Sequence, residues 1–251
     1  MSDTLFRLDG KVAIVTGAGR GMGRGIAETL ARQGATVAVN DFYAERAEAA
    51  AAELRAAGFK AVAAPCDVTD YDAVHRMVAA VREHAGNVDI YVSNAGVPTS
   101  GMGYGKFLES KPEDWARFVQ LNLYGLMNGC HAVLPGMIEQ RWGRIVAITS
   151  ESWRAAVPMG IAAYAASKAG VVGFVRQLAA EVGRKGVNVN ALSLGTMNNW
   201  EGAEELARKN CIVPRAGSPA DVGAGVAYLV SREAEWVTGQ IHPLNGGGIT
   251  A

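Results

Sequence analysis

The sequence has little of what cross-links small secreted domains or builds structural metal sites. Its 251 residues contain only 3 cysteines, Cys66, Cys130 and Cys211, which are widely spaced and form no CxxC pair. An odd number of isolated cysteines argues against both a disulfide framework and a structural zinc site. Free thiols are typical of a reducing cytosol, so we expect a cytoplasmic protein that is stabilised by its hydrophobic core.

The sequence also lacks an excess of charge and any long apolar run. It has 24 Lys plus Arg against 24 Asp plus Glu, a formal net charge of zero. Nucleic acids and anionic membranes select basic surfaces, so we expect neither as a partner. No apolar stretch approaches the roughly 20 residues that span a bilayer. Residues 1–10 are polar and acidic rather than typical of a signal peptide.

What the sequence does contain is a regular alternation of two patterns. Short apolar, β-branched runs predict strands at 12–16, 35–40, 60–64, 89–93, 144–149, 187–192 and 240–244. Longer patterns between them predict helices at 21–33, 44–57, 71–84, 113–137, 162–182 and 219–231. Such alternation is typical of an α/β fold, and we expect a single-domain, Rossmann-type, doubly wound parallel sheet with helices on both faces over residues 1–251.

A glycine-rich segment follows the first predicted strand. Thr16, Gly17, Gly21 and Gly23 form the pattern TGxxxGxG, which does not meet the strict GxGxxG spacing. Glycines there let the backbone approach a pyrophosphate, and the following helix N-terminus offers free N–H groups. No Gly-Lys-Ser/Thr closes the segment, so it is not a triphosphate P-loop. The alternative interpretation is a tight turn that binds no ligand.

An acidic residue ends the second predicted strand. Asp41 lies 20 positions after Gly21, where a carboxylate can accept hydrogen bonds from the adenosine ribose and repel a 2′-phosphate. Asp41 could instead only cap the next helix. Arg20 points the other way, because a guanidinium can pair with a phosphate. We give Asp41 the greater weight, so NAD is preferred over NADP.

Tyr164 and Lys168 lie one helical turn apart near the start of the helix predicted at 162–182. A nearby Lys⁺ stabilises the phenolate, and lowering the phenol pKa by roughly three units corresponds to about 4 kcal/mol. That change makes Tyr a proton-transfer group at neutral pH. Taken alone, the pair could be a solvated helix face. Three further polar residues accompany it: Ser150 ends a strand, Asn94 ends another, and Asn122 sits within an otherwise apolar stretch of the helix predicted at 113–137.

Together these residues resemble the short-chain dehydrogenase/reductase family, of the roughly 250-residue kind, over essentially the whole chain. The matching motifs are Thr16-Gly17 with Gly21-Met22-Gly23, Cys66-Asp67-Val68, Asn94-Ala95-Gly96, Asn122, Ser150, Tyr164 with Lys168, and Leu194-Gly195. Each motif alone is a modest signal, whereas their joint order and spacing are highly specific.

The resemblance implies roles for these residues. Tyr164 would be the general acid in ketone reduction and the general base in alcohol oxidation. Ser150 would hydrogen-bond the substrate oxygen, and Lys168 would lower the Tyr164 pKa and hold the nicotinamide ribose. Asn122 would bend its helix and hold a water linked to Lys168. The remaining cofactor residues would be Gly17, Arg20, Gly21, Met22, Gly23, Asp41, Asp67, Val68, Asn94, Ala95, Gly96, Gly195 and Met197.

Two departures from the family pattern affect the site. Leu194 stands where the family usually has Pro before the Gly corresponding to Gly195, so that turn is less rigid. Ser150 and Tyr164 are 14 positions apart, one more than the commonest spacing, which leaves Ser152 as a rival for the serine role.

The substrate-contacting residues are expected among large apolar side chains near the site. Trp153, Met159 and Trp200 are the main candidates, with Met102 and Tyr104 in the loop after the fourth strand; Trp200 and Met102 could instead be lid or interface packing. Such groups fit a carbonyl or secondary alcohol with a hydrocarbon body. Glu151 and Arg154 could recognise a polar group or pair with each other. Residues 195–215 are expected to form a substrate lid.

The sequence thus predicts an NAD-dependent oxidoreductase that reversibly transfers hydride between nicotinamide and a ketone or secondary alcohol. The alternatives are a catalytically silent dinucleotide-binding scaffold or sensor and a cofactor-independent lyase such as a halohydrin dehalogenase. The intact Asn-Ser-Tyr-Lys set argues against the scaffold. The lyases carry Arg at the Lys168 position and lack the glycine-rich turn. The resemblance also implies a homotetramer built on the helices at 113–137 and 162–182 and on the last strand, with Gly246, Gly247 and Gly248.

Overall fold

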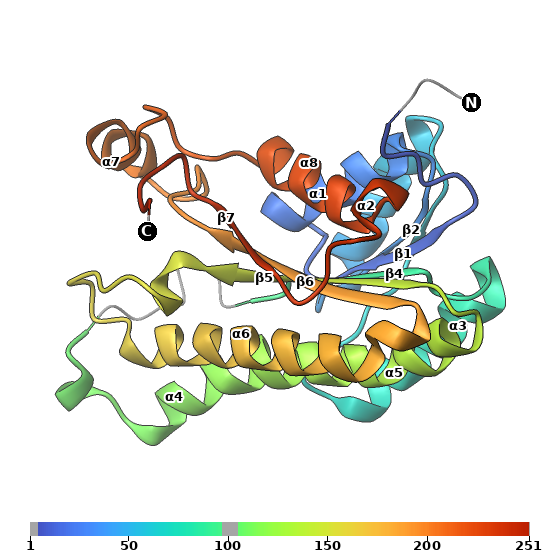
Figure 1. Ribbon diagram of the computed structural model, residues 1–251, viewed down its shortest axis with the longest axis horizontal. Coiled ribbons are helices and arrows are strands. Elements are labelled where there is room, and N and C mark those ends of the chain that lie inside the picture. Colours follow the sequence, from blue (N-terminus) through green and yellow to red (C-terminus); the bar gives the residue numbers. More distant parts are fainter. Residues whose placement is uncertain (1–4, 97–104, 251) are drawn as a thin grey trace.

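A computed structural model describes residues 5–96 and 105–250, and within them one parallel sheet organises the chain (Figure 1). The sheet has seven strands in the order β3-β2-β1-β4-β5-β6-β7, and every neighbouring pair is parallel. The strands are β1 Val12–Val15, β2 Thr36–Val39, β3 Ala61–Ala63, β4 Ile90–Ser93, β5 Gly143–Ser150, β6 Val187–Leu194 and β7 Ile241–Leu244. The predicted α/β fold class is therefore confirmed.

Helices cover both faces of the sheet (Figure 1). One face carries α1 Gly21–Arg32, α2 Ala44–Ala56 and α8 Pro219–Val230, and the other carries α3 Tyr71–Ala85, α5 Gly125–Glu139 and α6 Ala162–Val182. Each side has its own apolar core, because parallel strands bury both of their faces. None of the helices within residues 5–96 and 105–250 combines the length and apolar character needed to cross a membrane.

The central strands are almost completely buried. All four residues of β1 and of β4 are buried, as are the first seven of the eight residues in both β5 and β6. Burying one Val, Leu or Ile side chain stabilises the fold by about 1.5–3 kcal/mol, so these unbroken apolar runs determine which segments form the middle of the sheet. The polar residues that end these strands are held rigidly as a result.

The strand order changes direction between β1 and β4. β1 pairs with β2 on one side and with β4 on the other, so the chain continues outward from this point in opposite directions. In open α/β sheets ligands bind at such a switch point, beyond the carboxyl ends of the strands. The glycine-rich turn after β1 and Asn94 after β4 both lie there.

The single helix expected at 113–137 is interrupted. The structure has α4 Pro112–Val119, a π-helical turn η3 Gln120–Tyr124 that contains Asn122, and then α5. Single π-turns inside helices occur often at functional sites. The interruption turns the buried Asn122 side chain toward α6, where it bonds to Ser167.

Several short elements were not expected. A helix, α7 Ala203–Asn210, lies inside the segment that was expected to be a lid, beyond the strand ends in Figure 1. Short 3-10 turns occur at Phe107–Glu109 (η2), Glu151–Trp153 (η4), Gly183–Lys185 (η5) and Arg232–Ala234 (η6). At the edge of the sheet, β7 contains Pro243, opposite Ser193 of β6.

Candidate active site

The glycine-rich turn is shaped by its backbone. Gly21, the first residue of α1, has φ +59°, a conformation that favours glycine, and a Cβ added there would project into open space. Gly23 is different, because a Cβ there would collide with the Gly17 carbonyl oxygen and the Asn94 side chain. Glycine is thus required at Gly21 by conformation and at Gly23 by close packing.

Thr16 and Asn94 fix this turn to the end of β4. The Asn94 side-chain amide donates to the carbonyl oxygens of Thr16 at 2.9 Å and Gly17 at 3.3 Å. In return, Thr16 Oγ1 accepts hydrogen bonds from the backbone N–H groups of Asn94 at 3.0 Å and Ala95 at 2.9 Å. Two segments almost eighty residues apart in the sequence are locked together by these four bonds.

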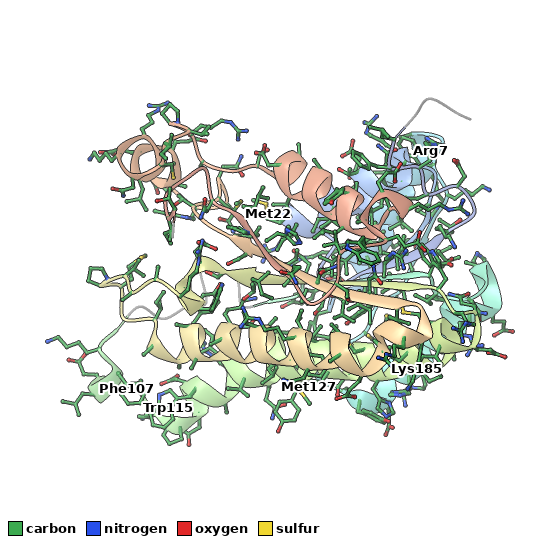
Figure 2. All side chains as sticks on the ribbon, viewed as in Figure 1. Arg7, Met22, Phe107, Trp115, Met127 and Lys185 are labelled. Atoms are coloured by element: carbon green, nitrogen blue, oxygen red, sulfur yellow. The ribbon has the colours of Figure 1, made fainter. Side chains whose placement is uncertain are left out.

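The start of α1 fits an anionic group such as a pyrophosphate. The preceding Arg20 is extended and exposed and makes no capping hydrogen bond with its side chain, and the first turn contains no acidic residue. The N–H groups of the first turn of α1, which includes the half-buried Met22 (Figure 2), therefore have no side-chain acceptor at the cap. Together with the open space at Gly21, this arrangement leaves room and hydrogen-bond donors for an anionic group.

Asp41 is 7% exposed and already accepts two hydrogen bonds. Its Oδ2 accepts from Gly19 N at 3.2 Å and its Oδ1 from Tyr43 N at 3.1 Å. Asp41 therefore joins the glycine-rich turn to Tyr43, which is the N-cap residue of α2, and does not itself cap that helix. A carboxylate accepts about four hydrogen bonds, so acceptor capacity for a ribose hydroxyl remains.

Asp67 and Val68 follow β3. Asp67 Oδ1 accepts from the backbone N–H and the hydroxyl of Thr69, both at 2.8 Å, while Val68 is buried. The Asp67 carboxylate therefore stabilises its own loop, and its Oδ2 is the atom left to contact a nucleotide.

Tyr164 and Lys168 lie together at the start of α6, beside the end of β5. The Lys168 side chain is buried, and its Nζ donates to the carbonyl oxygen of Ile148 at 2.9 Å. Lys168 Nζ lies 5.8 Å from the centre of the Tyr164 ring. Burial lowers the Lys168 pKa to about 8, so the amine is still mostly charged at neutral pH.

Asn122 reaches the same place from the π-helical turn. Its Nδ2 donates to Ser167 Oγ at 2.9 Å, and that hydroxyl in turn donates to the Tyr164 carbonyl oxygen at 2.7 Å. Its Oδ1 is buried and has no partner within the described residues. A Cβ at Gly96 would lie 3.1 Å from this oxygen and 3.8 Å from Lys168 Nζ, so Gly96, Asn122 and Lys168 converge. An orphaned acceptor beside a buried amine indicates a place that a water or ligand completes.

Ser150 is the last residue of β5 and is only half-buried. Its Oγ accepts a hydrogen bond from Ser152 N at 3.3 Å. The hydroxyl oxygen of Ser152, the rival for the serine role, is buried and has no partner in the part of the chain that the structure describes. Both residues are half-buried, so exposure does not separate them, and the choice of Ser150 still rests on its position at the end of β5.

The expected substrate residues do not form one surface. The Trp153 indole N–H donates to Ser193 Oγ at 3.1 Å, which directs the ring toward β6. Met159 is 40% exposed and lines a hollow with Pro158 and Lys106, whereas Trp200 is 36% exposed near the start of α7. Met102 and Tyr104 lie outside the described residues.

A cavity of about 280 Å³ lies beside Tyr164, and most of its lining was not anticipated from the sequence. It is bounded by Phe107, Trp115, Phe118, Gly160 and Tyr164, among others. The Phe107 and Trp115 rings, both labelled in Figure 2, stack with their centroids 5.0 Å apart, and Phe118 meets Tyr164 edge-on at 6.0 Å. The aromatic residues between 107 and 118 were the available signal for this cavity. They were overlooked because Trp115 and Phe118 were assigned to the helix predicted at 113–137.

Glu151 and Arg154 pair with each other, which is one of the two roles that the sequence analysis left open for them. Arg154 donates through Nε at 3.0 Å and Nη2 at 2.7 Å to Glu151 Oε2, and the Asn245 side chain donates to the same oxygen at 3.0 Å. These bonds connect η4 to the segment after β7. Glu151 is 5% exposed, so its carboxylate is a buried anchor next to Ser150.

The segment after β6 is held by backbone bonds. Gly195 N donates to the Leu244 carbonyl at 3.0 Å, and Asn198 N donates to the Gly217 carbonyl at 2.9 Å. Met197 is 6% exposed and forms a bridge with Gly217. The family usually has Pro at the position of Leu194. In this chain, backbone hydrogen bonds hold the turn in place without that proline.

Ser167 and Thr149 are polar residues that the sequence analysis missed. Ser167 joins Asn122 to the backbone of Tyr164, and Thr149 Oγ1 donates to the Lys168 carbonyl at 3.1 Å. Ser167 lies between Tyr164 and Lys168 in an otherwise small, apolar stretch, which was a usable signal. Within residues 5–96 and 105–250, no group of three or more His, Cys, Asp or Glu side chains is arranged to hold a metal ion.

Comparison with known proteins gives consistent matches over nearly the whole chain. A family model described as short chain dehydrogenase matches residues 11–209. The oxidoreductase UcpA of Salmonella typhimurium is 36% identical over 256 aligned residues, covering 96% of this chain and 95% of that protein.

Two solved structures superpose closely. A gluconate 5-dehydrogenase from Burkholderia cenocepacia, in complex with NADP and tartrate, has a TM-score of 0.91 and 31% identity over 98% of each chain. A 3-oxoacyl-[acyl-carrier protein] reductase from Brucella melitensis, with bound NAD, has a TM-score of 0.90 and 34% identity, covering 100% of this chain and 98% of that one. By the family match, the sequence relatives and the shared fold, this protein belongs to the short-chain dehydrogenase family of oxidoreductases.

Proposed function

We propose that this protein transfers hydride reversibly between a nicotinamide dinucleotide and a ketone or secondary alcohol, with Tyr164 as the proton-transfer residue. The observation that carries the proposal is the convergence of Tyr164, the buried Lys168 and the unpaired Asn122 Oδ1 beside the end of β5. Burying the charged Lys168 amine lowers the stability of the folded protein. A binding protein without catalytic activity would gain nothing from the amine at this place, whereas an enzyme needs it to stabilise the Tyr164 phenolate.

The residues of the nucleotide end fit a dinucleotide. The first turn of α1 would hold the pyrophosphate, Asp41 the adenosine ribose, Asp67 and Val68 the adenine, and Asn94, Ala95 and Gly96 the edge of the sheet beside them. Gly195 and Met197 would offer backbone groups to the carboxamide. When bound, the nicotinamide supplies or accepts the hydride.

The chain's own residues handle the proton. In reduction, Ser150 Oγ hydrogen-bonds the substrate carbonyl oxygen and Tyr164 Oη gives that oxygen its proton as the carbonyl carbon gains hydride. In oxidation the same Tyr164 oxygen removes the hydroxyl proton. The charged Lys168 stabilises the phenolate that forms, and Asn122 holds the backbone carbonyl of Tyr164, near the start of α6, through Ser167.

NAD is proposed as the preferred dinucleotide. The carboxylate of Asp41 lies at the end of β2, where it would repel a 2′-phosphate, while the exposed Arg20 is free to swing toward solvent. The related structures have been solved with NADP in one case and NAD in the other, so Asp41 is the residue on which the preference depends.

The substrate is proposed to occupy the cavity beside Tyr164, and the segment 195–215 is proposed to close over the site as a lid, although none of its residues lines this cavity in the structure. Its aromatic walls fit a hydrocarbon body, and Trp153, Met159 and Trp200 would contribute from outside the cavity. The oligomer is proposed to be a homotetramer that covers the outer faces of α5 and α6; Met127 of α5 is exposed there (Figure 2). Sedimentation velocity measures that state directly.

The proposal is tested with Tyr164→Phe. A panel of secondary alcohols with NAD⁺, followed by absorbance of the reduced cofactor, first identifies a substrate. We expect Tyr164→Phe to lose at least about 10³-fold in kcat while NADH binding, measured by calorimetry, changes by less than about threefold. A variant that keeps turnover within about tenfold of the wild type would remove Tyr164 from the mechanism.

A further inference from the structure

Three rings cluster where α3 packs against α5, and none of them takes part in the reaction proposed above. Tyr71 and His75 belong to α3, and His131 belongs to α5. The two imidazole rings lie 5.2 Å apart between centroids, and the Tyr71 ring lies 4.1 Å from His75 and 5.4 Å from His131. His75 is half-buried, while Tyr71 and His131 are exposed.

The polar atoms of the cluster point at one another. His75 Nε2 lies 3.1 Å from His131 Nδ1, and Tyr71 Oη lies 3.1 Å from the same His131 nitrogen. The other nitrogen of His75, Nδ1, lies 2.8 Å from the Tyr71 carbonyl oxygen. A carbonyl only accepts, so Nδ1 of His75 carries a proton, and in the neutral ring the lone pair is therefore on Nε2.

The protons available to a neutral cluster do not satisfy both contacts well. If His131 carries its proton on Nδ1, that one hydrogen must be divided between His75 Nε2 and Tyr71 Oη. If it carries the proton on its other nitrogen, the lone pairs of His75 Nε2 and His131 Nδ1 face each other at 3.1 Å. In the first tautomer the His131 Nδ1 proton can bond His75 Nε2 while the exposed Tyr71 hydroxyl bonds water; in the second, both lone pairs are available to a metal cation.

We propose that His75 and His131 form a binding site for a divalent transition-metal ion of the zinc, nickel and copper class. Two nitrogen ligands of a tetrahedral zinc, each at about 2.0–2.1 Å, lie about 3.3 Å apart, so the observed separation needs a change of only a few tenths of an ångström. Imidazole suits these three metals. The Tyr71 hydroxyl faces the same point, and water completes the coordination.

The surroundings of His75 support this assignment. Metal-binding histidines usually donate their second ring N–H to a carbonyl or carboxylate, which fixes the ring and makes the ligating nitrogen more basic. The Tyr71 carbonyl does this for His75, one helical turn earlier on α3. One of the two ligands is therefore already oriented, and the site joins two helices rather than two residues of one helix.

The metal would staple α3 to α5. A neighbouring contact lies on the same pair of elements, because the Asn128 side chain of α5 donates to the Val68 carbonyl at 3.0 Å and the Thr69 carbonyl at 3.3 Å, just before α3. The staple is thus expected to stiffen the segment that leads into α3. Since the metal would bind the folded protein and not the unfolded chain, it should also raise the melting temperature.

The test uses the intact, tag-free protein and zinc chloride, with nickel chloride as a second probe. We expect calorimetry to give one Zn²⁺ site per chain with Kd tighter than about 100 μM, and a rise in melting temperature of a few degrees at saturating Zn²⁺. His75→Ala and His131→Ala should each weaken binding by at least about tenfold. The matched control is His84→Ala, an exposed histidine in the last turn of α3, which should bind like the wild type.

Copper gives a spectroscopic check on the ligands. Cu²⁺-loaded protein should show hyperfine coupling to two imidazole nitrogens in electron paramagnetic resonance, and His75→Ala or His131→Ala should reduce it to one. The proposal is overturned if the wild type shows no Zn²⁺ binding below about 1 mM, or if the His75 and His131 variants bind Zn²⁺ as the His84 variant does. Unchanged circular dichroism spectra establish that the variants are folded.

Discussion

The nucleotide end and the chemistry end of this site are built in different ways. At the nucleotide end, the polar side chains have protein partners: Asn94 bonds the turn, Asp41 bonds Gly19 and Tyr43, and Asp67 bonds Thr69. At the chemistry end, three buried polar atoms have no partner within the described residues: Asn122 Oδ1, Glu151 Oε1 and Ser152 Oγ.

This difference shows which end of the site already has its hydrogen bonds formed before a ligand binds. The nucleotide end gets its shape from backbone geometry and closed hydrogen bonds, so it is pre-organised for a large ligand. The chemistry end keeps an unpaired acceptor and a buried amine, each of which costs stability until the site is filled. Variants can separate the two halves, because each depends on different residues.

Lys168→Met should give the largest effect, and it acts on the chemistry end alone. It removes the cation that stabilises the Tyr164 phenolate, so kcat is expected to fall by about 10³-fold. NADH affinity should fall by no more than about tenfold, because the glycine-rich turn and Asp41 are untouched. Steady-state kinetics and calorimetry on the same preparation measure the two numbers, and an equal loss in both would erase the distinction between the halves.

The pH dependence of stability should expose the cost of burying Lys168. Its pKa is lowered from 10.5 in the unfolded chain to about 8, so the unfolded state binds the extra proton between these values. The free energy of unfolding contributed by this group therefore rises as pH increases from about 8 to 10.5, by about 3 kcal/mol in all. Below pH 8 the penalty for holding the charged amine is present in full.

Urea unfolding of the wild type and Lys168→Met at pH 7.5, 9 and 10 measures this contribution of Lys168 to the free energy of unfolding. The stability of the wild type relative to the variant should increase across the series, while unrelated titrations cancel in the difference. A constant difference would mean that the buried amine is not desolvated in the folded protein.

Gly23→Ala should break the nucleotide end. Its new methyl group would collide with the Gly17 carbonyl oxygen and the Asn94 amide, so the turn has to open. We expect NADH affinity to fall by about 10²-fold and stability by about 1–3 kcal/mol. Gly21→Ala is the matched comparison, since its Cβ meets open space and only the positive φ is strained; it should cost about 1–2 kcal/mol. Equal losses in the two variants would contradict the packing argument.

Asp41→Ala should have the smallest effect and should change selectivity. Removing the carboxylate relieves its repulsion of a 2′-phosphate, so the ratio of NADPH to NADH affinity is expected to rise by about tenfold. Stability should fall slightly, because Gly19 and Tyr43 lose an acceptor. Calorimetric titration with both dinucleotides gives the ratio; if it stays constant, cofactor preference has another source.

Much of the fold could be predicted because its signals are local. Apolar runs such as Val12–Val15 are buried on both faces of the sheet, and Gly34, Gly58 and Gly86 lie at or just after the ends of helices. A local bend at Asn122 was implied by the family resemblance, but its form as a π-helical turn and the bond from Asn122 to Ser167, 45 residues away, have no local signal in the sequence. The helix Ala203–Asn210 was missed because its two buried residues, Ala203 and Ala207, give only a short apolar pattern.

In the site, as in the fold, local signals could be predicted and contacts between distant segments could not. Residue types at fixed spacing indicated Tyr164, Lys168 and Ser150, but spacing carries no information on what each side chain already bonds. The bond of Gly19 to Asp41 and the bond of the Trp153 indole to Ser193 join segments 22 and 40 residues apart, which spacing within one motif does not indicate. The aromatic wall of the cavity was hidden because Phe107, Trp115 and Phe118 come from two elements that the sequence suggested were a loop and one continuous helix.

Pro243 has a consequence for how copies of this protein meet. The carbonyl oxygens of Gln240 and Leu244 accept bonds from β6, so alternate residues of β7, including Pro243, face away from it. An additional strand approaching that border would find no N–H at Pro243 to bond. Proline at an outward position is a common natural safeguard against runaway sheet growth. Pro243 therefore weakens strand addition at the border of β7, and contacts between copies there gain less from backbone hydrogen bonds than from side chains.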